Sequence, residues 1–78
     1  MADHSALPPW RQLAARLRAD IAAGKYPPGG RLPSAVTLHQ EHGVAVVTAR
    51  KALASLVDDG QAYVITGMGT YVAGGGPG

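Results

Sequence analysis

The hydrophobic pattern of this 78-residue chain changes its period near residues 58–60, and that change narrows the choice of fold. Before it, apolar residues recur at the i, i+3, i+4, i+7, i+8 spacing of one helix face, namely at Ala49, Ala52, Leu53, Leu56 and Val57. After it come two runs rich in β-forming residues, 63–66 and 70–72, separated by Gly67-Met68-Gly69. The sequence therefore predicts a helix that ends at Asp58-Asp59-Gly60 and is followed by a β-hairpin.

Two further helices are predicted before that one. Pro8 and Pro9 favour a helix start, and a helix from about Trp10 to Ala23 would bury one stripe, made of Trp10, Leu13, Leu17 and Ile21. Ser34 is a good N-cap for a second helix from Ala35 to His42, with Gly43 as its stop. The fold class predicted is α+β, a small winged helix of three helices with a C-terminal β-hairpin wing.

Length and composition limit what such a chain can do. Seventy-eight residues leave room for one compact domain, expected at 9–73 between a disordered lead, 1–8, and a flexible Gly-rich tail, 74–78. Seven Lys and Arg against five Asp and Glu give a formal charge of +2, a mild bias towards phosphate. The chain has no Cys for a disulfide framework or a thiolate zinc site, and no apolar run long enough for a membrane span. We expect a cytoplasmic protein.

The second and third helices, joined by a tight turn at Gly43, are typical of a helix-turn-helix unit, in which the second helix of the pair enters the major groove of DNA. The buried stripe leaves several residues of the third helix on the outside: Val46, Val47, Thr48, Arg50 and Lys51. Arg50 could pair with guanine or a phosphate, Thr48 could bond a phosphate or base edge, and Val46 or Val47 could meet a thymine methyl group. The glycine-rich hairpin tip would approach the backbone or minor groove.

Other chemistries have weaker support. His39 and His42 lie three residues apart on one helix near Glu41, but two ligands make a weak metal motif, and partly buried packing histidines are the preferred interpretation. Gly67-Met68-Gly69 lacks the following helix and Lys of a phosphate-binding loop. No Ser-His-acid or Cys-His set is evident, so we predict neither an enzyme nor a bound cofactor or metal.

Several short motifs, in order and at matching spacing, resemble the N-terminal DNA-binding domain of the GntR family over about Pro9 to Ala73. They are Pro28-Gly29-Gly30-Arg31-Leu32-Pro33-Ser34, Gly43-Val44, Thr48-Ala49-Arg50-Lys51-Ala52-Leu53, Asp59-Gly60 and Gly67-Met68-Gly69-Thr70-Tyr71-Val72. The resemblance implies a winged helix that binds double-stranded operator DNA as a dimer on a palindromic site, usually to repress transcription. The C-terminal effector domain that family members normally carry is not in this chain.

With the resemblance, nine residues are predicted to contact DNA: Arg31, Ser34, Val46, Thr48, Arg50, Lys51, Gly67, Gly69 and Thr70. Arg11 is a weaker candidate for a phosphate contact. Where many members have an acidic residue followed by Arg, Ala35 and Val36 stand here. Val46 stands where many members have a polar residue or Arg, and Thr66 and Met68 stand where many have Arg. Fewer cations imply weaker binding with a shallower salt dependence than is typical of the family.

The lost arginines leave one alternative open. A winged helix can also serve as a protein-interaction module, with exposed Val46 and Val47 as its apolar anchor. Salt separates the two functions, because DNA binding weakens as ionic strength rises whereas an apolar protein contact barely changes.

Overall fold

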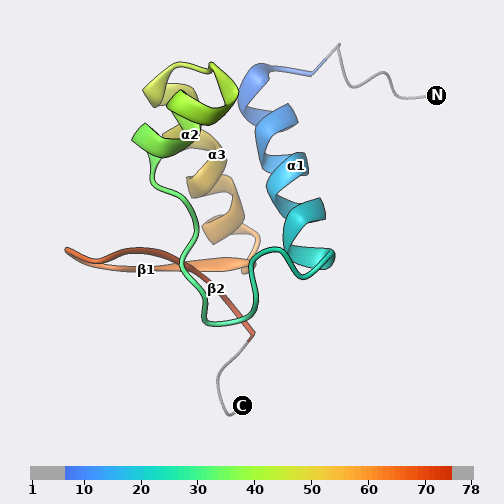
Figure 1. The fold of residues 1–78 in the computed structure, drawn as a ribbon, viewed down its shortest axis with the longest axis vertical. Helices are drawn as coiled ribbons and strands as arrows, with labels where there is room; N and C mark the ends of the chain where they lie inside the picture. Colours follow the sequence, from blue (N-terminus) through green and yellow to red (C-terminus); the bar gives the residue numbers. More distant parts are fainter. Residues whose placement is uncertain (1–6, 75–78) are drawn as a thin grey trace.

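The computed structural model describes residues 7–74, which form three helices followed by a two-stranded antiparallel hairpin (Figure 1). The elements are α1 (Pro9–Ala22), α2 (Ala35–His42), α3 (Val46–Asp58), β1 (Ala62–Ile65) and β2 (Gly69–Val72). The predicted α+β winged helix is therefore confirmed. Most of the predicted lead and tail lie outside the described residues. Across residues 7–74, the helices are too short or too polar to span a bilayer.

The core lies where α1, α2 and α3 meet above the hairpin (Figure 1). Every element contributes at least one side chain that is buried, and the largest fully buried ones are Leu17, Leu32, Leu38, Leu56 and Val72. Each such side chain stabilises the fold by about 1.5 to 3 kcal/mol relative to its exposure to water. Within residues 7–74 no polar or charged residue is classed as buried, so apolar packing accounts for the core.

The bounds of α2 are those predicted, because both of its ends are specified locally. The Ser34 hydroxyl oxygen accepts a hydrogen bond from the Thr37 N–H at 3.1 Å, which satisfies one of the free amides of the first turn. Gly43 closes the helix with φ +69°, a left-handed conformation that costs glycine little, and its N–H donates to the His39 carbonyl at 3.0 Å. The chain then turns into α3 at once.

The bounds of the two hairpin strands differ by one residue from the prediction. The predicted strand 63–66 is observed as Ala62–Ile65, and the second strand begins at Gly69 rather than Thr70. Ala62 pairs with Val72, and both side chains are buried against the helices. This buried pair fixes the register, since a one-residue slip would turn it towards solvent. Thr66 consequently lies in the turn, which the Met68 N–H closes by donating to the Ile65 carbonyl at 2.9 Å.

The loop between α1 and α2 runs along the free edge of β2. The Leu32 N–H donates to the Thr70 carbonyl and the Gly29 N–H to the Val72 carbonyl, each at 2.8 Å, and Arg31 forms an antiparallel bridge with Tyr71. Arg31-Leu32 thus pairs with the wing, a contact that the sequence did not predict. The segment that leads into α2 is therefore hydrogen-bonded to the wing.

Candidate nucleic-acid interface

Helix α3 presents two different faces. Its buried stripe consists of Ala49, Ala52, Leu53 and Leu56, which pack into the core. Away from this stripe, Val47 is 71% exposed and Arg50 is exposed, whereas Val46 and Thr48 are only partly exposed. Of the two valines considered as methyl contacts, Val47 is therefore the more accessible.

The N-terminus of α3 has no side-chain cap. Ala45 occupies the N-cap position in an extended conformation, with φ −62° and ψ 149°, and makes no side-chain capping bond. The first turn contains no acidic residue. Because the first amides of a helix have no intrahelical acceptor and carry the positive end of the helix dipole, this end of α3 attracts negative charge.

Lys51 is exposed, but its ammonium group lies over the Trp10 ring. Its Nζ lies 4.9 Å from the centroid of the Trp10 ring, and the Arg11 guanidinium carbon lies 5.9 Å from the same centroid, both within cation–π range. Trp10 was predicted to lie on the buried stripe of α1, but it is only partly buried. The prediction was wrong because this indole packs against two cations at the outer edge of the α1–α3 contact.

The ion pairs separate the cations into two groups. Arg18 on α1 forms an ion pair with Asp59, just after α3, and its Nη2 also donates to the Ser55 hydroxyl at 3.1 Å. Lys25 forms a second ion pair, with its Nζ 3.9 Å from Asp20 Oδ2. Among residues 7–74, the other cations make no ion pair; they are Arg11, Arg16, Arg31, Arg50 and Lys51. Arg50 is therefore an exposed cation without an acidic partner in the described chain.

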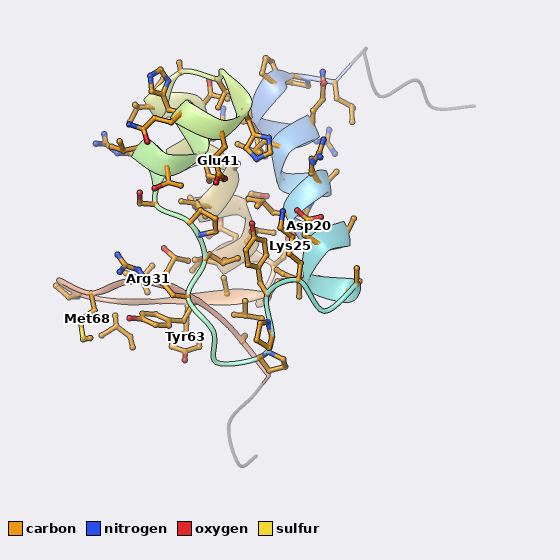
Figure 2. The ribbon with its side chains drawn as sticks, in the orientation of Figure 1. Asp20, Lys25, Arg31, Glu41, Tyr63 and Met68 are labelled. Atoms are coloured by element: carbon orange, nitrogen blue, oxygen red, sulfur yellow. The ribbon has the colours of Figure 1, made fainter. Side chains whose placement is uncertain are left out.

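Four of the predicted residues lie at the wing. The Arg31 side chain lies against Gly69, so closely that a Cβ atom at Gly69 would stand 2.9 Å from Nε. Gly69 also has φ +133°, a conformation that side chains rarely allow. Thr70 follows directly and is partly exposed, while Gly67 lies in the turn at the tip. Figure 2 shows Arg31 and Met68 near the hairpin, at the end of the molecule away from α1.

Aromatic and imidazole side chains serve packing or turn geometry. The rings of Tyr63 and Tyr71 stack across the hairpin, with centroids 5.9 Å apart and planes at 21°, so both rings pack against each other. His39 Nδ1 lies 2.6 Å from the Val44 carbonyl oxygen and must donate to it, since a carbonyl only accepts. His39 is exposed, contrary to the packing role preferred for it, whereas His42 is partly buried. Residues 7–74 contain no group of three metal-ligating side chains.

The predicted contacts thus fall into two groups on the structure. Val46, Thr48, Arg50 and Lys51 lie on the N-terminal half of α3, although Lys51 is held against Trp10. Arg31, Gly67, Gly69 and Thr70 lie at the wing, whose tip projects away from α1 on the side of α2 (Figure 1). The Ser34 side chain is engaged in capping α2 and also lies 3.0 Å from the Thr37 hydroxyl.

The amino-acid sequence is similar to those of known bacterial regulators. Residues 4–72 match the family described as "Bacterial regulatory proteins, gntR family". The chain is 46% identical over 65 residues to the mannosyl-D-glycerate transport/metabolism system repressor MngR of Escherichia coli, a match that covers 83% of this chain and 27% of that protein. It is 33% identical to the HTH-type transcriptional repressor NagR of Bacillus subtilis, over 88% of this chain and 28% of that protein. The chain therefore spans just over a quarter of the length of these relatives.

Solved structures show the same fold. The AraR DNA-binding domain in complex with operator ORX1 superposes with a TM-score of 0.84 at 35% identity, covering 92% of this chain and 87% of that one. YtrA from Sulfolobus acidocaldarius, a GntR-family transcription factor, superposes with a TM-score of 0.80 at 33% identity, covering 88% of this chain and 72% of that one. Together with the family match, these likenesses establish that the chain belongs to the gntR family of bacterial regulatory proteins and has the winged-helix fold of that family's DNA-binding domain.

Proposed function

We propose that this domain binds double-stranded operator DNA in a sequence-specific manner, as the DNA-reading part of a transcriptional repressor. Helix α3 would enter the major groove and the wing would lie on the backbone or in the minor groove. The observation that carries the proposal is Arg50, an exposed cation without an acidic partner in residues 7–74, on the helix that follows the left-handed turn at Gly43. An Arg on such a helix can form a bidentate pair with guanine.

The remaining predicted residues divide by role. Thr48 would bond a phosphate or base edge beside Arg50, and the half-buried Val46 would offer only part of its side chain to a base. Arg31, Gly67, Gly69 and Thr70 would follow the sugar-phosphate backbone, because Arg31 already lies along the wing at Gly69. Lys51 would reach a phosphate by leaving the Trp10 ring, and Arg11 lies beside the same ring. Ser34, which caps α2, would contribute chiefly by fixing the start of that helix.

Further features of the proposal follow from the resemblance to operator-binding regulators. The domain would bind as a homodimer to a palindromic operator, with one copy on each half-site. It would work in the cytoplasm without a cofactor or metal, and it would not be an enzyme. The reported relatives are DNA-binding regulators and lend no support to the alternative of a protein-interaction module.

A titration with DNA tests the proposal. The chain is mixed with random double-stranded fragments at two salt concentrations, and the bound fragments are then selected and sequenced. With Arg31, Lys51 and Arg11 on phosphates, the slope of log K against log salt should be about −3 per protomer, since each neutralised phosphate contributes about −0.9. Salt-sensitive binding that enriches a palindrome supports the proposal. No binding at low salt contradicts it and favours a protein partner.

A further inference from the structure

Val47 is the most exposed large apolar side chain among the described residues, at 71%. A single exposed valine on a helix needs no special explanation. Its position is informative, however, because it is the second residue of α3, in the turn that no side chain caps. Residues three apart lie on the same helix face, so Val47 and Arg50 are neighbours along one stripe of the surface. An apolar group thus stands beside an exposed cation that has no acidic partner in residues 7–74.

The spacing along α3 corresponds to between one and two base-pair steps of DNA. Three residues of an α-helix advance by about 4.5 Å, and successive base pairs are about 3.4 Å apart. In the major groove, guanine presents the two acceptors that suit an Arg, and thymine presents a methyl group. A helix that carries Arg50 and Val47 on one stripe therefore suits a guanine with a thymine at the adjacent or next-adjacent base pair.

We propose that Val47 contacts the C5-methyl group of an operator thymine that lies one or two base pairs from the guanine read by Arg50. This inference rests on the proposed function and specifies the base class that the site selects. Val47 is thus a specificity-determining residue whose apolar side chain selects a methyl group.

Two other valines of the helix-turn-helix unit fit this role less well. Val46 precedes Val47 on α3 but is only partly exposed, because it lies nearer the buried stripe. Val36 is 53% exposed and is also the second residue of its helix, but that helix is α2. In a helix-turn-helix unit the first helix crosses the backbone and only the second enters the groove. Val36 is therefore a matched control, with the same side chain in the same helical position.

The test removes the methyl group alone. A duplex selected from the random pool by this chain is synthesised with each thymine replaced in turn by 2′-deoxyuridine, which keeps every hydrogen-bonding group of the base. Affinity is measured for the wild-type chain, Val47→Ala and Val36→Ala. For the wild-type chain, replacing one particular thymine in each half-site should lower the affinity for the duplex about four-fold, which corresponds to the burial of one methyl group. Val47→Ala should show a clearly smaller loss at that thymine, because the shorter side chain reaches the methyl group less well, and Val36→Ala should show the full loss.

Two results overturn the inference. Either no single thymine near the guanine is sensitive to loss of its methyl group, or a sensitive thymine remains equally sensitive in Val47→Ala. Both leave the proposed function standing, because the duplex was selected by specific binding. If selection from the random pool enriches no sequence, the proposed function is contradicted, and this inference fails with it. Unfolding curves of the two variants should match the wild type, since both side chains are exposed.

Discussion

The two helices of the helix-turn-helix unit are held in place by different means. Helix α2 is specified at its ends, by the Ser34 cap and the left-handed Gly43, and its only buried residue is Leu38. Helix α3 has four buried residues, but its N-cap, Ala45, makes no side-chain bond. A helix anchored along its length can leave its first turn unsatisfied, whereas a helix with one buried residue depends on its caps. The first turn of α3 is thus available to a ligand.

The largest effect is expected at the single anchor of α2. Leu38→Ala should destabilise the domain by about 2 to 5 kcal/mol, because the side chain is fully buried and its loss leaves a cavity beneath a helix with no other buried residue. Chemical denaturation measures the change. Val36→Ala, on the exposed side of the same helix, should stay within about 0.5 kcal/mol of the wild type. A small loss at Leu38 would mean that the caps alone hold α2.

The next effect concerns the exposed stripe of α3. Arg50→Ala should weaken binding to the selected operator by about 1 to 3 kcal/mol and binding to random DNA by much less, because a bidentate pair with guanine discriminates between bases. Arg16→Ala removes another exposed arginine, on α1, and should leave this ratio unchanged. Equal losses on operator and random DNA would instead make Arg50 a phosphate contact.

A smaller effect is expected at the cap of α2. Ser34→Ala should lower the free energy of unfolding by about 1 kcal/mol, because the Thr37 amide loses its acceptor. Ser34→Asp supplies a new acceptor and should restore most of the stability. If Ser34→Ala were as stable as the wild type, the claim that end capping stabilises α2 would be incorrect.

The smallest effect is expected when a capping side chain is added at the N-terminus of α3. Ala45→Ser and Ala45→Asp each provide the missing cap and should stabilise the domain by about 0.5 to 1 kcal/mol in thermal unfolding. Their DNA affinities should diverge, because the aspartate places a negative charge where the proposed complex would bring a phosphate or base edge, whereas serine is neutral. Similar affinities for the two variants would place the first turn of α3 away from DNA.

Local signals in the sequence were enough to predict most of the fold. The cap, the glycine stop and the 3.6-residue period are properties of neighbouring residues, and α2 was predicted to the residue by Ser34 and Gly43. The one-residue error in the bounds of the hairpin strands arose because strand pairing depends on burial of the Ala62–Val72 pair against the helices. A β-rich composition locates a strand without fixing the residues at which its pairing begins and ends.

The site was harder to predict, since it depends on contacts between distant segments. Nothing local to Trp10 indicates that Lys51 will lie over its ring, or that Arg18 will pair with Asp59 and leave the set of available cations. The contact of Arg31 with Gly69 likewise requires the loop before α2 to pair with the wing. Periodicity did place Val47 and Arg50 outside the core, but only the structure separates the open Val47 from the half-buried Val46.

The most direct test of the account is an NMR titration of the ¹⁵N-labelled chain with a duplex that it selects. If α3 and the wing form the interface, amide shift changes should concentrate at residues 45–51 and 66–70, while the C-terminal half of α1 stays unperturbed. Changes centred on α1, with the first turn of α3 unaffected, would contradict the claim that this turn is left open for DNA.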